Sequence, residues 1–420
     1  MKILHINTSE LTGGAAIAAH RLMEAQNAIG LQAEMLVRDA ETSDAHVHAL
    51  TAQRRMWLKF VGERLDIVLR NRSRANLWQI DTGFFGADLT RTALFADTDI
   101  LHLHWINQGM LSLRGLERIL RSGKPVVWTL HDMWPVTGIC HHADGCRKFE
   151  SACHTCPLLH RRGLHDLASQ VFARKQEIYR EGRLALVACS DWLAGEARAS
   201  ALSKGLRVES ITNPIDTTYF TPADKVAARR ELGLPQDMPL LLFVAQKVTN
   251  PAKGFQFLAE AIDRLIASGA FTRETIGVVP VGMESEQAAQ MLSCKSFPQP
   301  YSSDLSRTRS LYRAADLLVM PTLMDNLPNT IAEASACGLP TIGFRIGGLP
   351  QMIDDGRTGY LCSYCSAEHL ASLIQQALTS DRRDEMGRFA RQKAEEMFAQ
   401  ERVAQRYQAL YESLLNPVSK

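Results

Sequence analysis

Residues 325–334 read Asp-Asn-Leu-Pro-Asn-Thr-Ile-Ala-Glu-Ala and follow an apolar run at 317–321. The apolar run predicts a buried strand. Pro328, with its fixed φ and no N–H, suits the first position of a helix, which Asp325 or Asn326 can cap. The open N–H groups of that helix would face whatever lies beyond the strand. The stretch therefore predicts a site for an anion such as a diphosphate.

Two carboxylates bracket the predicted helix start, Asp325 just before it and Glu333 inside it. Beside a bound anion, such carboxylates can accept hydrogen bonds from neutral sugar hydroxyls. The alternative is an ordinary helix whose acids are solvated. The residues alone leave both interpretations open.

Length and composition limit the class of protein. A chain of 420 residues with 46% hydrophobic content is too long for one core and predicts two α/β domains. A formal net charge of +2 gives no overall field that would attract nucleic acid, so no nucleic-acid partner is expected. No apolar run is long enough to cross a membrane, and the first residues resemble a strand rather than a signal peptide. We therefore expect a cytoplasmic protein.

Strand-like apolar runs alternate with helical stretches along the whole chain, which predicts parallel sheets covered by helices on both faces. The runs are 3–6, 33–37, 100–105, 125–130, 185–188, 240–245, 276–280, 316–320 and 340–344. A turn-rich segment near 212–222 falls at mid-chain, where a domain boundary is expected.

The segment 325–333 resembles the E-x7-E element of the retaining glycosyltransferases of family 4, with Asp325 in the place of the first Glu. Its form D-N-L-P-N-T-I-x-E resembles a subgroup that assembles exopolysaccharides of the colanic-acid type. The resemblance implies the α/β GT-B fold, two Rossmann-like domains with a cleft between them. It implies an acceptor-side domain at 1–214, a nucleotide-sugar domain at 215–394, and a helix within 395–420, over about 395–414, that crosses back to the first domain.

The implied function is a hexosyltransferase-type, retaining transfer of a sugar from a nucleotide-sugar donor to a growing, lipid-linked polysaccharide acceptor. No catalytic cofactor is expected, because helix ends and Lys253 can offset the charge of the leaving group. Two alternatives remain: a nucleotide-sugar epimerase of GT-B fold, and a non-catalytic nucleotide-sugar-binding protein.

The resemblance also implies the donor contacts. It places Lys253 on the diphosphate, Glu333 on the nucleotide ribose and Asp325 on the transferred sugar. The family's arginine position holds Gln246, with Lys247 beside it. The implied donor-binding set is Gly13, Gly14, Gln246, Lys247, Lys253, Asn326, Leu327, Asn329, Thr330 and Glu333, and the implied catalytic set is His131, Asp325 and Glu333.

The first half supplies two further elements. Gly13 and Gly14 follow the first strand, where small residues let a ligand approach the backbone. His131 ends the strand at 126–130 in an H-D-x-W pattern that resembles the family's donor-sugar histidine. His102 and His104 lie two apart and so on one strand face. That spacing suits a metal, yet we favour packing or, for His104, contact with the acceptor.

Four cysteines lie within a short stretch at 140–156: Cys140, Cys146, Cys153 and Cys156. They could bind a structural zinc ion, form two disulfides, or remain free thiols. The spacing is not that of a standard zinc finger, so all three remain open.

A basic segment at 54–74 carries seven Arg or Lys residues together with Trp57, Phe60, Val61, Leu65 and Val68 at helical spacing. This pattern is typical of a helix that lies on an anionic membrane surface. It equally fits a helix that packs its apolar face on the first domain.

Overall fold

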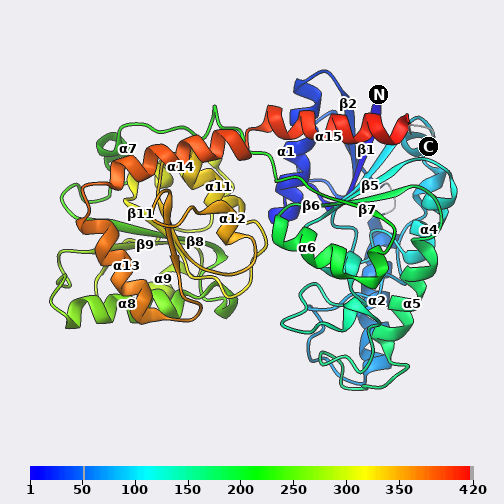
Figure 1. Ribbon diagram of the computed structural model, residues 1–420, viewed down its shortest axis with the longest axis horizontal. Helices are drawn as coiled ribbons and strands as arrows, with labels where there is room; N and C mark the ends of the chain where they lie inside the picture. Colours follow the sequence, from blue (N-terminus) through cyan, green and yellow to red (C-terminus); the bar gives the residue numbers. More distant parts are fainter. Residues whose placement is uncertain (51–52, 417–420) are drawn as a thin grey trace. The chain divides into compact units, whose positions relative to one another are not determined.

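The computed structural model describes residues 1–50 and 53–416. The chain divides into two compact units, one of residues 1–214 with 401–420 and the other of residues 215–400 (Figure 1). The last four residues of the segment expected at 395–420 lie outside the described residues.

The first unit is built on a seven-stranded sheet in the order β3-β2-β1-β4-β5-β6-β7, and every pairing is parallel. Its strands are β1 (Lys2–Ser9), β2 (Gln32–Asp39), β3 (Val47–Ala49), β4 (Ile100–Leu103), β5 (Val126–Leu130), β6 (Leu184–Ala188) and β7 (Arg207–Ser210). Its helices are α1 (Gly14–Ala28), α2 (Gln53–Asn71), α3 (Ala93–Ala96), α4 (Leu113–Arg121), α5 (Leu167–Ile178), α6 (Asp191–Ala199) and α15 (Gln400–Leu415).

The second unit has a six-stranded parallel sheet in the order β10-β9-β8-β11-β12-β13. Its strands are β8 (Leu240–Lys247), β9 (Gly277–Met283), β10 (Lys295–Ser296), β11 (Leu317–Met320), β12 (Thr341–Phe344) and β13 (Gly359–Cys362). Its helices are α7 (Lys225–Glu231), α8 (Phe255–Ala267), α9 (Ser285–Ala289), α10 (Leu305–Ala314), α11 (Asn329–Ala336), α12 (Leu349–Met352), α13 (Ala367–Thr379) and α14 (Arg383–Met397).

These two sheets confirm the predicted parallel α/β class, and each of the nine predicted strands is present. Strands β3, β7, β10 and β13 were not predicted. Each is four residues or shorter, and the polar β3, β7 and β10 carry no apolar run that would reveal them.

Helix α15 packs on the first unit although it lies at the end of the chain. Its residues Val403, Tyr407, Leu410 and Tyr411 are buried in one cluster with Ile3 of β1. The last helix, expected over about 395–414, is α15, which begins later, at Gln400, while residues 395–397 end α14. The break has a local cause: the backbone at 398–400 pairs with Ile215, whose N–H donates to Phe398 O at 2.7 Å.

A buried ion pair joins α7 to the start of two central strands of the second unit. Nη2 of Arg229 lies 2.6 Å from Oδ2 of Asp316, and the same oxygen accepts the N–H of Leu240 at 2.8 Å. Arg229 also donates to the carbonyl of Ala314. The guanidinium thus links α7 to the starts of β8 and β11.

We predict that Arg229→Met destabilises the second unit by about 3–5 kcal/mol, because the carboxylate of Asp316 stays buried with its main partner removed. Arg230→Met is the control, since Arg230 is exposed on the same helix. Urea unfolding should separate the two variants. Equal stability of both would show that the ion pair contributes nothing.

Candidate functional site

Each sheet reverses its strand order at one point, between β1 and β4 in the first unit and between β8 and β11 in the second. In open parallel sheets, ligands bind beyond the carboxyl ends of the strands at such a switch point. The sequence-predicted residues lie at these two edges.

In the second unit, the loop after β8 and the loop after β11 are held together by backbone contacts. The N–H of Leu323 donates to Ala252 O at 2.9 Å, and the hydroxyl of Thr322 donates to the same carbonyl at 3.1 Å. Gly254, with φ +75°, packs so closely that an added Cβ would lie 1.8 Å from Pro321 O. These contacts fix where Lys253 points.

Lys253 and Asp325 meet at this edge. Nζ of Lys253 lies 2.7 Å from Oδ2 of Asp325. The lysine side chain is 32% exposed and the aspartate 16%, so the pair faces solvent from a partly covered position. The structure therefore brings together the residue expected on the diphosphate and the residue expected on the sugar.

Helix α11 begins one residue later than predicted. Pro328 is the N-cap residue, with an extended ψ of 122°, and it supplies no side-chain cap. Asp325 is instead engaged by Lys253 and accepts the N–H of Asn326 at 3.2 Å.

Glu333 lies on α11 and is 8% exposed. The hydroxyl of Tyr312, on α10, donates to its Oε2 at 2.7 Å. Tyr312 is itself buried, so it fixes the direction of the carboxylate. No sequence pattern pointed to Tyr312, because the two residues belong to different helices and share no motif.

The remaining residues predicted to bind the donor in the second unit differ in exposure. Asn326 and Leu327 are buried, whereas Asn329 and Thr330 are half-buried at the start of α11. Gln246 and Lys247 are exposed at the end of β8. Nζ of Lys247 lies 2.7 Å from Oε1 of Glu284, which leaves Lys253 as the lysine that faces the loop after β11.

In the first unit, Gly13 and Gly14 lie at the turn from β1 into α1. Gly13 has φ +96°, and both glycines are exposed with open space where a Cβ would lie. Backbone conformation, rather than crowding, therefore explains glycine at Gly13.

His131 lies at the end of β5, next to a carboxylate with structural partners. Asp132 accepts hydrogen bonds from Trp105 Nε1 at 2.9 Å and from the N–H of Trp134 at 2.8 Å, and its Oδ2 lies 2.7 Å from His141 Nδ1. Although burial opposes ionisation, His141 lowers the pKa of Asp132 to about 2. Asp132 thus anchors the loop that carries His131.

His104 is only 3% exposed, and both of its ring nitrogens have partners. Nε2 lies 2.9 Å from Nδ1 of His5, and Nδ1 lies 3.1 Å from Nε2 of His131. Direct contact with an acceptor would require one of these bonds to break.

The cysteine-rich insert places its thiols around one cavity. Cys140, Cys146, Cys153 and Cys156 line a cavity of about 130 Å³, and none of the four forms a disulfide. The N–H of Gly138 donates to Cys153 Sγ at 3.3 Å. Burial raises the pKa of the Cys156 thiol, and backbone hydrogen bonds from Leu158 and Leu159 partly offset this. Such N–H to sulfur bonds favour thiolate ligands.

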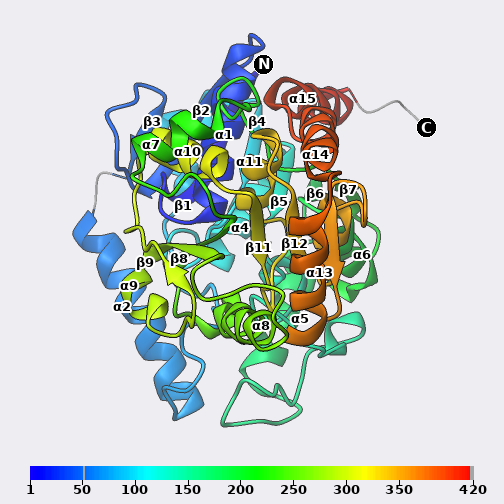
Figure 2. The same cartoon turned by 90° about the vertical axis from the view of Figure 1, so that its left-hand side faces the viewer.

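Helix α2 exposes apolar side chains along one side. Trp57, Leu58, Leu65 and Leu69 are each more than half exposed, between 55% and 65%. In both views of Figures 1 and 2, α2 lies at the opposite end of the first unit from α15. Met56 and Ile67 form the face that packs inward.

Comparison with known families identifies the chain. A model described as Glycosyltransferase Family 4 matches residues 12–219, and one described as Glycosyl transferases group 1 matches residues 238–380. Together the two matches cover most of both units.

This chain belongs to the family 4 glycosyltransferases.

Relatives agree with this assignment over part of their length. D-inositol 3-phosphate glycosyltransferase 2 of Catenulispora acidiphila is 35% identical over 168 residues, 37% of this chain and 38% of the relative. Putative colanic acid biosynthesis glycosyl transferase WcaC of Escherichia coli K12 is 31% identical over 274 residues, 60% of this chain and 61% of the relative. The chain thus matches less than two thirds of either relative.

Among solved structures, Anabaena Alr3699/HepE in complex with UDP-glucose is similar to this chain with a TM-score of 0.65 at 15% identity. The similarity covers 98% of this chain and 100% of that one. It confirms the GT-B fold. None of the helices formed by the described residues is long and apolar enough to span a membrane.

We predict that Gly254→Ala in this glycosyltransferase disturbs the contact between the loops that follow β8 and β11. The substitution places a side chain at positive φ, which costs roughly 1–2 kcal/mol, and forces the Lys253 loop away from Pro321. The thermal unfolding temperature should therefore fall further in Gly254→Ala than in Gly269→Ala.

Gly269 is the matched control, because it has the same φ of +75° with open space where the Cβ would lie. The difference between the two variants isolates the close approach. Equal losses would mean that the loop accommodates the methyl group without moving.

Proposed function

We propose that this glycosyltransferase transfers a sugar, with retention of configuration, from a nucleotide-sugar donor to a growing, lipid-linked polysaccharide acceptor. The proposal of a nucleotide-sugar donor rests on the contact of 2.7 Å between Lys253 and Asp325 at the switch point of the second sheet. The names of two similar proteins, a putative colanic acid glycosyl transferase and a protein solved with UDP-glucose, support the substrate classes.

The donor diphosphate would take the place of Asp325 as the partner of Lys253. An ammonium group and the positive end of α11 both attract an anion here. Released from the lysine, Asp325 can accept a hydroxyl of the transferred sugar. Glu333, already oriented by Tyr312, can accept the ribose hydroxyls.

The transfer itself needs position and charge stabilisation more than a protein base. The bond between the anomeric carbon and the phosphate oxygen breaks, and the acceptor oxygen bonds to that carbon from the same face. The acceptor proton passes to the leaving phosphate oxygen. Lys253 stabilises the charge that develops on the phosphate, and His131 contacts the transferred sugar.

A thermal-shift screen of UDP-, GDP- and ADP-sugars tests the donor site, because a bound ligand raises apparent stability by mass action. We expect one donor class to stabilise the protein. Glu333→Gln should weaken that donor by about 1.5–3 kcal/mol, the range for a hydrogen bond to a charged group.

Glu396→Gln, an exposed change on α14, is the control and should leave donor binding unchanged. A donor that binds Glu333→Gln and the native chain equally would contradict the assignment. Release of an epimer or free sugar without any acceptor would instead support the epimerase alternative.

We further propose that α2 lies on an anionic membrane surface, where a lipid-linked acceptor resides. The support is the exposed apolar stripe of Trp57, Leu58, Leu65 and Leu69 together with the exposed Arg54, Arg55, Arg70 and Arg72. Apolar residues would enter the interface while the arginines contact lipid phosphates.

Co-sedimentation with vesicles that contain phosphatidylglycerol should pellet the native chain, and the double change Leu58→Glu with Leu65→Glu should abolish this. Leu305→Glu, at a 46% exposed position on α10, should pellet normally. The proposal would be wrong if the chain bound neutral and anionic vesicles equally and the double variant bound as well as the native chain.

We also propose a structural zinc ion at Cys140, Cys146, Cys153 and Cys156. The shared cavity and the N–H to sulfur bonds support it. Binding would draw the sulfurs closer together, since in the described part of the chain the set of ligand atoms within 4.8 Å of one another is a histidine set.

Elemental analysis of the purified chain should find zinc, and Cys153→Ser should lose both the metal and thermal stability. Cys365→Ser is the control, because Cys365 is an exposed thiol outside the insert. Absence of zinc, with all four thiols open to alkylation, would establish them as free cysteines.

A further inference from the structure

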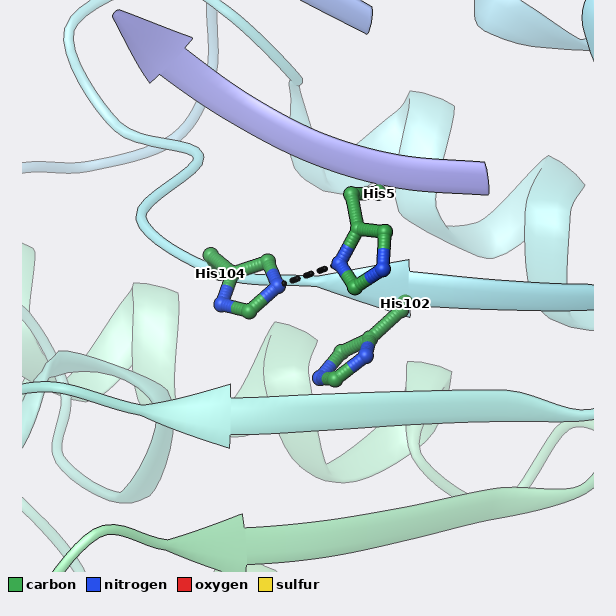
Figure 3. Close-up of side chains that lie close together, drawn as sticks. All are labelled: His5, His102 and His104. Atoms are coloured by element: carbon green, nitrogen blue, oxygen red, sulfur yellow. Dashed lines mark hydrogen bonds between the residues drawn. The ribbon is translucent and has the colours of Figure 1, made fainter. Parts of the chain in front are cut away.

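Four side chains form a continuous hydrogen-bonded column inside the first unit: Gln26, His5, His104 and His131. Oε1 of Gln26 lies 2.8 Å from Nε2 of His5. Nδ1 of His5 lies 2.9 Å from Nε2 of His104, the contact drawn in Figure 3. Nδ1 of His104 lies 3.1 Å from Nε2 of His131. The column therefore leads from helix α1 to the end of β5.

A second branch connects the column to α15. Nε2 of Gln26 donates to the hydroxyl of Tyr411 at 2.9 Å, and that hydroxyl lies 2.6 Å from Nδ1 of His102. Nε2 of His102 lies 2.7 Å from the hydroxyl of Thr129. Gln26 and Tyr411 are both fully buried, so water does not compete for these bonds.

Every imidazole in the two branches is neutral at physiological pH. Burial lowers the pKa of His5 and of His131 to about 4, and it lowers the pKa of His102 and His104 well below the usual value. A neutral ring carries one N–H and one lone pair, so each ring must donate on one side and accept on the other.

The orientation of the Gln26 amide then decides the proton positions along the column. Because its nitrogen donates to Tyr411, its oxygen faces His5, and His5 must carry its proton on Nε2. Nδ1 of His5 consequently accepts from His104, and Nδ1 of His104 accepts from His131. Each ring of the column has the same tautomer.

We propose that Gln26 and Tyr411 are positioning residues that fix His131 in the Nε2–H tautomer through His5 and His104. The other nitrogen of His131, Nδ1, carries a lone pair and can only accept a hydrogen bond. Any hydrogen bond that His131 makes through Nδ1 is therefore one that it accepts, as from a sugar hydroxyl, and Nδ1 cannot donate to a phosphate oxygen. Turning the Gln26 amide over would reverse every bond. Tyr411 opposes this because its single O–H proton is donated to Nδ1 of His102, so its oxygen can only accept from Gln26.

A metal ion is the alternative occupant, because the ligand atoms of His5, His102 and His104 lie within 4.8 Å of one another. Two observations disfavour it. Both nitrogens of each ring already have partners. The rings of His102 and His104 are also stacked, with centroids 4.3 Å apart and planes at 24°. Lone pairs lie in the ring plane, so these two stacked rings do not aim theirs at one point.

Nitrogen NMR of the full chain, labelled at histidine, tests the inference directly. We expect His5, His104 and His131 to show protonated Nε2, with no change on addition of zinc. Tyr411→Phe removes the acceptor of the Gln26 amide, so Gln26 can turn and His131 should lose its single tautomer. Tyr179→Phe is the matched control, a buried tyrosine of the same unit that donates to Pro135 O instead.

This inference deepens the proposed function, since the role of His131 toward a sugar rests on it. In Tyr411→Phe we expect kcat to fall roughly two- to tenfold, as for one lost neutral hydrogen bond, with the donor KM unchanged. A proton on Nδ1 of His131 in the native chain, or an unaltered tautomer in Tyr411→Phe, would overturn the column. Failure of every nucleotide sugar to bind would instead overturn the proposed function and leave the tautomer result standing.

Discussion

The constraint on which both sites depend is the reversal of strand order beside the first strand of each sheet. Parallel strands all end at one edge, and at the reversal the connections on either side leave in opposite directions. Backbone polar groups and short loops are therefore exposed at that point. In the second unit this geometry brings Lys253 to Asp325. In the first unit His131 lies one strand further on, after β5, which is separated from β1 by β4.

Sequence reasoning was adequate where the signal was local. Apolar runs located nine of the strands, and the segment 325–333 located the start of α11 to within one residue. The sequence did not predict side-chain contacts between residues that lie far apart in the chain. Asp325 was expected as a cap, yet Lys253, 72 residues away, engages it. No pattern within either segment contains that information.

The buried histidines are a second case in which sequence patterns could not identify the hydrogen-bond partners. Strand periodicity placed His102 and His104 on one face, and their rings do stack at 4.3 Å. It could not show that His5 joins them from β1 or that Gln26 and Tyr411 complete their hydrogen bonds. Those partners come from three elements spread across 406 residues, since Tyr411 lies that far from His5 in the numbering. Only the folded sheet brings them together.

The docking of α15 has a consequence for synthesis. A ribosome completes the second unit before it makes Val403, Tyr407 and Tyr411, which close the core of the first. Until then the nascent first unit presents an uncovered apolar surface and leaves the amide of Gln26 without its phenol partner. Nearly two hundred codons are translated before this helix is made, and over that interval the exposed apolar surface makes the nascent chain prone to aggregation.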